Sequence, residues 1–176
     1  MTRVHSFPPL SNERAVCLIL GSMPGRASLQ AGQYYAHPRN AFWPIIEQVF
    51  GIPGDLPYAQ RCTQLLRRRV AVWDVLKTCT RTSSLDSDIV ESTIVTNDFR
   101  TFFAKHPAIR YVYFNGAMAE RTFARYVLPG LPGEFEALPR LRLPSTSPAN
   151  ASYSFGQKLV HWRAVAQEAS DASTAS

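Results

Sequence analysis

Residues 15–28, AVCLILGSMPGRAS, join a short apolar run to a glycine-rich turn. The run is rich in β-branched and aliphatic side chains, which predicts a buried strand. Three further runs predict strands at residues 70–75 (VAVWDV), 109–114 (IRYVYF) and 138–143 (LPRLRL), of which the last is the least apolar. The opening stretch therefore marks the first strand of a sheet and the first loop at its edge.

Helical patterns separate these strands. They cover residues 42–50, 59–68, 98–104, 117–127 and 157–168. Strands that alternate with helices form βαβ units, so the sequence predicts an α/β fold: a three-layer α/β/α sandwich around a central, mainly parallel four-stranded sheet. No repeat or linker divides the chain. We therefore expect a single domain over residues 1–168 and a flexible C-terminal tail of small polar residues over 169–176.

The composition is that of a globular protein. The chain has 176 residues, of which 45% are hydrophobic and 18% are charged, and this excludes disorder, collagen and coiled coil. No apolar run reaches the roughly 18 residues of a membrane span, and the N-terminus has no secretory pattern. The three cysteines lie far apart, which argues against a disulfide framework or a metal site. We expect a soluble cytoplasmic monomer with no cofactor, no bound metal and no membrane partner.

The charge balance is basic. Lys and Arg number 19 against 13 Asp and Glu, which gives a formal net charge of +6, and most of the cations are arginine. Arginine matches phosphate with a planar fork of donors, so this balance favours nucleic acid or phosphorylated ligands. A basic surface that only keeps the protein soluble is the alternative.

Polar residues follow all four predicted strands. The loops begin with GSMPGRAS at residue 21, with Asp74, with Asn115, and with PSTSPAN over residues 144–150. Because the carboxyl ends of parallel strands share one edge of the sheet, we expect these loops to meet there and to carry the function. The loop at 21–43 holds neither a P-loop nor a dinucleotide-binding fingerprint.

Residues 21–43 resemble the first motif of the uracil-DNA glycosylase superfamily: a G-x-x-P-G turn, an aromatic residue, and H-P-x-N-x-F-W. The variants G-S-x-P-G and H-P-R-N resemble the hypoxanthine-DNA glycosylase branch in particular. Residues 73–89 and 143–152 are similar to the second-strand motif and the C-terminal DNA-contacting loop of that branch. The resemblance spans about residues 15–165. It implies a monofunctional DNA repair glycosylase that removes a deaminated base from DNA, hypoxanthine first and uracil or xanthine as alternatives, by base flipping.

The resemblance implies that Asn40, in H-P-R-N, is the catalytic residue. Its amide oxygen would hold the attacking water. The competing position, the third residue of the G-x-x-P-G turn, is Met23, which neither holds nor activates water. Asparagine is also a favoured helix cap, and a helix is predicted from residue 42, so capping is the alternative role.

The resemblance also implies two sets of binding residues. Tyr35 would stack on the extruded base, and Asp74, at a position where uracil-specific relatives carry asparagine, would accept the N1 hydrogen of hypoxanthine. The base-binding set is Gly21, Ser22, Met23, Tyr35, Asp74 and Asn115, and the DNA-binding set is Arg39, Ser145, Thr146, Ser147 and Pro148.

Structural roles are open for several of these residues. Tyr35 is alternatively a core or rim tyrosine, Asp74 a cap or the partner of an arginine, and Asn115 a turn residue. For the whole chain, the alternative is a catalytically inert DNA-binding module on the same scaffold. The features that favour it are Met23 and Ser145, because Ser145 replaces a histidine of the water-activating relatives.

Overall fold

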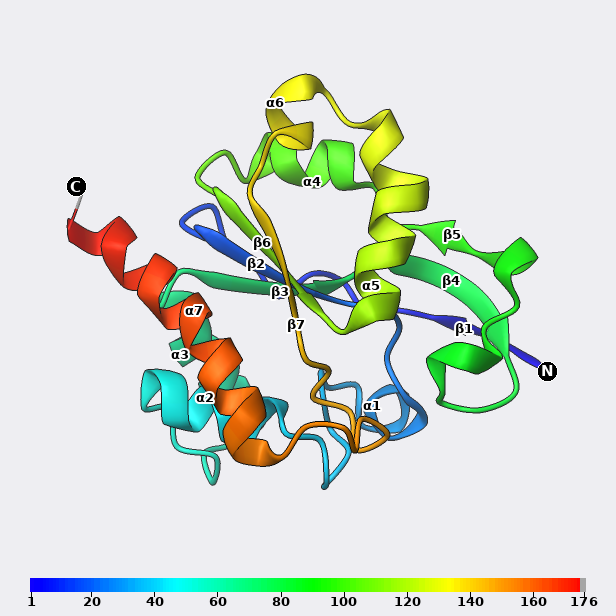
Figure 1. The fold of residues 1–176 in the computed structure, drawn as a ribbon, viewed down its shortest axis with the longest axis horizontal. Helices are drawn as coiled ribbons and strands as arrows, with labels where there is room; N and C mark the ends of the chain where they lie inside the picture. The colour runs from blue at the N-terminus through cyan, green and yellow to red at the C-terminus, as the bar shows by residue number, and fades with distance from the viewer. Residues whose placement is uncertain (175–176) are drawn as a thin grey trace.

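The computed structural model describes residues 1–174. Its main sheet has four strands, β2 (Cys17–Gly21), β3 (Val70–Asp74), β6 (Tyr111–Asn115) and β7 (Arg140–Leu143), in the order β3-β2-β6-β7 (Figure 1). All three pairings are parallel. The predicted four-stranded sheet is confirmed, and its strand ends lie within about two residues of the sequence-based boundaries.

Helices cover both faces of the main sheet. On one face lie α2 (Phe42–Phe50), α3 (Tyr58–Arg67) and α7 (Phe155–Thr174), and on the other lie α4 (Phe99–Lys105) and α5 (Ala117–Thr122) (Figure 1). The helix that begins with α5 continues through a π-helical turn at Phe123–Val127. Shorter helices are α1 (Arg26–Ala31), α6 (Gly133–Glu136) and the 3₁₀ turns Asp86–Asp88, Glu91–Thr93 and Leu128–Gly130. The three-layer α/β/α sandwich is thereby confirmed.

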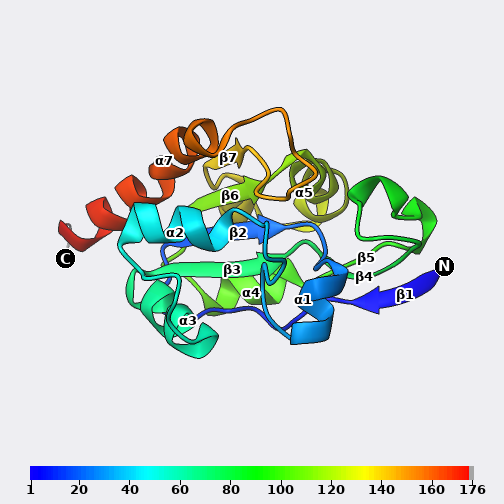
Figure 2. The ribbon, with the colours of Figure 1, turned by 90° about the horizontal axis from the view of Figure 1, so that it is seen from below.

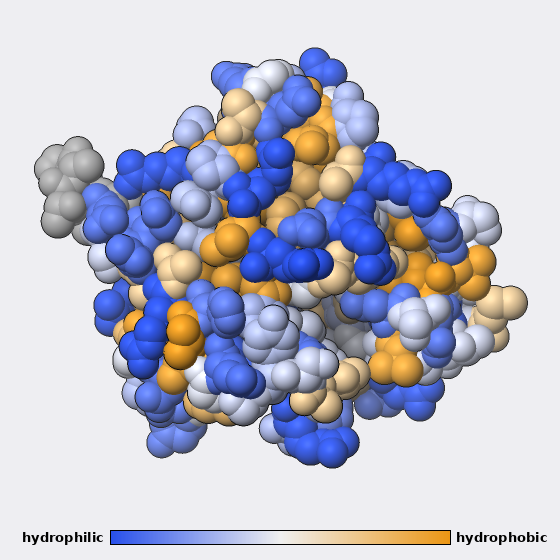
Figure 3. All heavy atoms as spheres, in the orientation of Figure 1, coloured by the Kyte–Doolittle hydropathy of each residue, from blue (hydrophilic) through white to orange (hydrophobic). Residues whose placement is uncertain are grey.

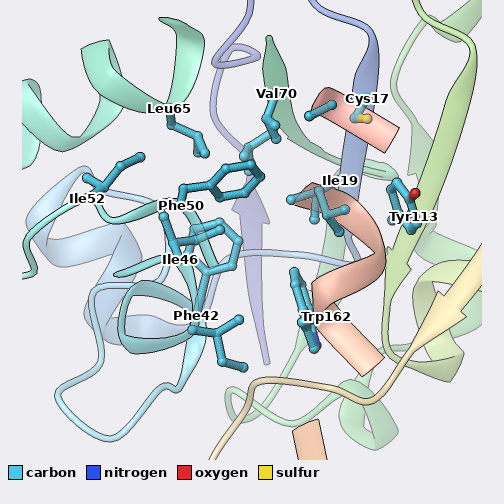
Figure 4. Close-up of a cluster of buried hydrophobic side chains, with 14 of the residues drawn as sticks. Cys17, Ile19, Phe42, Ile46, Phe50, Ile52, Leu65, Val70, Tyr113 and Trp162 are labelled. Carbon is cyan, nitrogen blue, oxygen red and sulfur yellow. The ribbon is translucent and has the colours of Figure 1, made fainter. Parts of the chain in front are cut away.

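The strand β2 alternates between two hydrophobic clusters. Ile19 belongs to the cluster that contains Phe42 and Trp162 (Figure 4). Its neighbours Leu18 and Leu20 belong to the cluster on the opposite face. Successive side chains of a strand point to opposite faces, so a strand that is apolar throughout must be covered on both sides.

A second, three-stranded sheet was not predicted. It consists of β1 (Thr2–His5), β4 (Leu76–Arg81) and β5 (Val95–Thr96) in antiparallel pairs. Only Val75 separates β3 from β4, so one continuous stretch of chain serves both sheets (Figure 1). This small sheet carries the segment after β4 toward the carboxyl edge of the main sheet.

The predicted C-terminal tail differs from the structure. Helix α7 runs to Thr174, and Ala169 is buried in a core cluster. Residues 169–174 are therefore helical, because a helix that is already packed on the sheet through Ala169 extends into residues whose own helix propensity is low. Residues 175–176 lie outside the described part of the chain.

The three cysteines, Cys17, Cys62 and Cys79, are free and buried. Within residues 1–174, no helix has the length and apolar character needed to cross a bilayer.

Candidate active site

A pocket of about 700 Å³ lies at the carboxyl edge of the main sheet. This volume is within the range of ligand-binding sites. The arrows of β2 and β3 point toward α1 and its neighbouring loops in Figure 2, and Figure 3 shows a hollow near the centre of one face of the molecule. All four predicted loops contribute to the wall, as the sequence predicted. Of the predicted site residues, the pocket is lined by Gly21, Ser22, Met23, Tyr35, Asn40, Asp74, Asn115, Ser145, Thr146, Ser147 and Pro148.

Three residues meet closely at the ends of β2 and β3. Gly21 pairs with Asp74 in the sheet register. A Cβ atom on Gly21 would lie 2.6 Å from Oδ1 of Asp74 and 3.0 Å from the Tyr35 hydroxyl. Glycine is therefore required here by close approach and not by backbone conformation.

Asp74 is a buried carboxyl group with an unsatisfied atom. The residue is 3% exposed, and its Oδ2 has no hydrogen-bond partner among the described residues. Burial, and then the neighbouring Asp86 carboxyl, raise the pKa of Asp74 from 3.8 to about 7, and the Arg81 guanidinium opposes them. Neither a capping hydrogen bond nor an arginine salt bridge occupies this side chain in the described structure. Such a group in a pocket is a candidate for ligand binding.

Tyr35 is half-buried, and one face of its ring is covered. Its ring stacks on Phe42 with centroids 4.0 Å apart. The backbone of Tyr35 has φ 55°, a left-handed conformation that is uncommon outside glycine. Its buried hydroxyl has no partner with hydrogen-bond geometry. Burial, and then the Asp74 carboxyl, raise the pKa of the Tyr35 phenol. The neighbouring Asn115 amide lowers this pKa and so offsets part of the rise. Tyr35 is thus both a rim and a core residue.

Asn40 lines the pocket, and its side chain also bonds to the backbone at the start of α2. Its Oδ1 accepts a hydrogen bond of 2.9 Å from the backbone N–H of Phe42, the first residue of α2. The N-cap of α2 is Ala41, so Asn40 is not the helix cap that the sequence offered as the alternative. An amide oxygen has two lone pairs, and the bond to Phe42 occupies one. The bond to Phe42 fixes the side chain in position and leaves one acceptor site for water.

Met23 lies in the hydrophobic cluster on the α4 and α5 face while it lines the pocket. Its side chain is 7% exposed, so packing accounts for an apolar residue in the G-x-x-P-G turn.

Asn115 and Thr146 form a clamp between β6 and the loop after β7. Nδ2 of Asn115 donates to Oγ1 of Thr146, and Oδ1 accepts from the Thr146 backbone N–H, each at 2.9 Å. The Thr146 carbonyl accepts from Ala41, and Thr146 is 1% exposed. Asn115 was expected to bind the base and Thr146 to bind DNA. In the structure their polar groups bond to each other, so Thr146 is not free to contact DNA. Ser145, Ser147 and Pro148 remain available along the wall.

Arg39 is the one predicted site residue that does not line the pocket. Its side chain is exposed, and its backbone N–H donates to Nδ1 of His37 at 3.1 Å. This bond orients the loop, and it places the proton of a neutral His37 ring on Nε2.

Comparison with known proteins identifies the family. The model of the family "Uracil DNA glycosylase superfamily" matches residues 8–169. A protein named hypoxanthine DNA glycosylase from Methanosarcina acetivorans is 34% identical over 168 residues, which covers 92% of this chain and 96% of the relative. A protein of the same name from Methanosarcina barkeri is 36% identical over 113 residues, or 64% of this chain and 70% of the relative.

The chain belongs to the uracil DNA glycosylase superfamily. Membership makes it a DNA glycosylase, a hydrolase of N-glycosidic bonds. The fold agrees, since the solution NMR structure of a candidate uracil DNA glycosylase from Methanosarcina acetivorans superposes with a TM-score of 0.80 at 30% identity. That superposition covers 96% of this chain and 99% of the other.

Sequence reasoning missed part of this glycosylase pocket. The loop after β4 contributes Ser84, Leu85, Asp86 and Ser87 to the wall. The serines and aspartates of that loop were visible in the sequence, but the strand that carries them there was not predicted. Lys158 was also missed: it is 6% exposed, and its Nζ lies 3.4 Å from the Ser147 carbonyl, which it supports from α7.

Within the described residues no cluster of three His, Cys, Asp or Glu side chains could hold a metal ion.

Proposed function

We propose that this glycosylase removes hypoxanthine from DNA, and that uracil and xanthine are poorer substrates. The observation that carries the proposal of a deaminated base is the buried Asp74 carboxyl group in the pocket, whose unpartnered Oδ2 can accept the ring N–H that hypoxanthine, uracil and xanthine all carry. The names of the two relatives and the H-P-R-N segment favour hypoxanthine among these bases.

Asp74 discriminates hypoxanthine from adenine by hydrogen-bond polarity. Hypoxanthine carries a hydrogen on N1, whereas adenine, from which it arises by deamination, presents a lone pair there. An ionised carboxylate only accepts hydrogen bonds, so it binds the N1–H of hypoxanthine and repels the N1 lone pair of adenine. A site that reads one hydrogen in this way rejects a base without it by several orders of magnitude.

Asn40 positions the attacking water. Its oxygen is held by the Phe42 N–H, and its remaining lone pair binds a water hydrogen. The water oxygen forms a bond to C1′ of the sugar while the bond from C1′ to the base nitrogen breaks. The electron pair leaves with the base as its anion, and the base takes up the proton that the attacking water loses, so the products are free hypoxanthine and an abasic site. Asn40 contributes by orientation and not by proton abstraction.

The Ser145, Ser147 and Pro148 wall contacts the DNA backbone near the extruded nucleotide. Short hydroxyl side chains allow a phosphate to approach closely. The Asn115 clamp and Lys158 hold this wall in place.

The experiment is a single-turnover cleavage assay on duplexes that contain hypoxanthine, uracil, xanthine or adenine at one position. Hot alkali then cuts the strand at each abasic site. We expect cleavage at hypoxanthine to be fastest, cleavage at adenine to be absent, and the hypoxanthine rate to rise with pH through about 7 as Asp74 ionises. Faster cleavage at uracil than at hypoxanthine would refute the proposed substrate.

The catalytic role of Asn40 is tested with Asn40→Ala in the same assay. We expect cleavage to fall at least about a hundredfold while DNA affinity stays near that of the parent, since the residue acts in the transition state. Loss of the hydrogen bond to Phe42 costs about 0.5–1.5 kcal/mol of stability, so rates are compared per folded molecule. Normal cleavage by a destabilised Asn40→Ala variant would leave Asn40 with a structural role alone. If even the parent protein cleaves none of the substrates, the inert DNA-binding module is favoured.

A further inference from the structure

Arg81, the last residue of β4, is a buried cation. Its side chain is 4% exposed. Nη2 donates to the Pro24 carbonyl, whereas Nη1 has no hydrogen-bond partner among the described residues. None of the carboxylates in that part of the chain forms an ion pair with Arg81. A buried charge without an ion pair destabilises a protein, so packing alone does not account for an arginine at this position.

The bond to Pro24 joins Arg81 to the turn that forms part of the pocket. Pro24 lines the pocket, and so does Ser22, two residues earlier. Ser22 Oγ in turn donates to Asp86 Oδ1 at 2.6 Å. Asp86 and Asp74 both line the pocket, whereas Arg81 does not. The guanidinium therefore lies behind a wall that carries two carboxyl groups.

The groups that act on Asp74 come from three segments of the chain. Burial raises the pKa of Asp74 most, Asp86 on the loop after β4 raises it further, and Arg81 lowers it. Tyr34 and Tyr35, in the loop after α1, also interact with Asp74, and their hydroxyl groups stay neutral because burial raises both pKa values. Among the described residues, Arg81 is thus the cation that favours the ionised form of Asp74.

The second carboxyl group, Asp86, is held in a similar way. Burial raises its pKa, while the Ser22 hydroxyl, then Arg81 and then Arg121 lower it. Arg121 is exposed, so water screens its charge, whereas the charge of Arg81 acts through the protein interior. Arg81 therefore faces both carboxyl groups of the pocket wall as their buried counter-charge.

We propose that Arg81 is a positioning residue that keeps Asp74 in its ionised, hydrogen-bond-accepting form at neutral pH. The proposal rests on the proposed function, in which the Asp74 carboxylate accepts the ring N–H of the extruded base. Two neighbouring carboxylates repel each other, and a guanidinium that is not neutralised by an ion pair offsets this repulsion. Arg81 acts through Asp74 and does not itself contact the base.

The experiment measures single-turnover cleavage of hypoxanthine in a duplex from pH 6 to pH 9 for the parent, Arg81→Gln and Arg81→Lys. Glutamine keeps an N–H donor for the Pro24 carbonyl and removes the charge, and lysine keeps the charge. The control is Lys77→Met, which removes one positive charge from an exposed position of the same strand, outside the pocket. Rates are compared per folded molecule.

We expect the midpoint of the pH profile to rise from about 7 in the parent to about one unit higher in Arg81→Gln. Arg81→Gln should then cleave about fivefold more slowly than the parent at pH 7 and within about twofold of it at pH 9. Arg81→Lys should recover most of the shift, and Lys77→Met should match the parent. Arg81→Met should show the same shift as Arg81→Gln, so misfolding of one variant leaves the other as a test. An unshifted midpoint, or a loss of equal size at every pH, would overturn the proposal.

A second measurement reads the ionisation of Asp74 without cleavage. The carboxyl carbons of aspartate are labelled with ¹³C, the Asp74 signal is assigned with Asp74→Asn, and its titration is followed by NMR in the parent and in Arg81→Gln. If the Asp74 midpoint rises in Arg81→Gln but the parent does not cleave hypoxanthine, the proposed function fails and the effect of Arg81 on Asp74 stands. If hypoxanthine is cleaved but the Asp74 midpoint is the same in both proteins, the role of Arg81 fails and the proposed function stands.

Discussion

Replacing Asp74 with asparagine should make the protein more stable at high pH and leave its stability at low pH almost unchanged. The substitution keeps the shape of the side chain and removes its charge. Asp74 is 3% exposed and has an unpartnered Oδ2, so the ionised form is disfavoured in the folded protein. Burial and the Asp86 carboxyl raise its pKa from 3.8 to about 7.

Because the pKa of Asp74 is raised in the folded protein, its contribution to the free energy of unfolding falls as the pH rises. The folded protein binds the Asp74 proton more tightly than the unfolded chain, so the favourable contribution is fully present below about pH 4. It is lost as the pH rises through 7, because the folded state must then ionise a buried carboxyl group. A shift of about three pKa units corresponds to about 4 kcal/mol at 1.36 kcal/mol for each unit. The asparagine side chain of the variant does not titrate, so the variant does not suffer this loss.

The assay is urea unfolding of the parent and of Asp74→Asn at several pH values between 4 and 9. We expect the free energy of unfolding of the variant, minus that of the parent, to increase by up to about 4 kcal/mol across this range, with most of the change between pH 4 and 7. Asp55→Asn is the control for the same chemical change at the surface, since Asp55 is exposed. A difference for Asp74→Asn that does not change with pH would show that the carboxylate is not destabilised in the folded protein. It would remove the physical basis for an unpaired acceptor in the pocket.

Three further perturbations test the remaining parts of the site. Gly21→Ala should cost about 1–3 kcal/mol and reduce cleavage, because its Cβ would lie 2.6 Å from Asp74 Oδ1; parent-like melting and rates would contradict this contact. Tyr35→Phe should be neutral or slightly stabilising, since it removes a buried hydroxyl without a partner, whereas Tyr35→Ala should lower the melting temperature clearly; equal melting of the two would place the ring outside the core. Affinity for duplex DNA should fall steeply with salt concentration in a titration, as expected for a net charge of +6, and a salt-independent affinity would argue against phosphate contacts.

The sequence by itself determined the layers of the fold and the place of the site. Periodicity is a local property, so the runs at 15–20 and 70–75 predicted buried strands, and the segments between them predicted the helices that cover the sheet. Parallel strands bring their carboxyl ends to one edge, and this topological rule sufficed to collect Asn40, Asp74 and Asn115 around one pocket.

Only the tertiary structure decided what each side chain does there. Whether Thr146 contacts DNA or braces a loop depends on Asn115, which lies 31 residues away along the chain. The pKa of Asp74 depends on burial and on Asp86, and the burial of Arg81 depends on a strand, β4, whose pairing partner is the N-terminal β1. Burial, the distance to other charges and strand pairing all depend on residues that are far apart in the sequence. No local pattern of residues therefore predicts them.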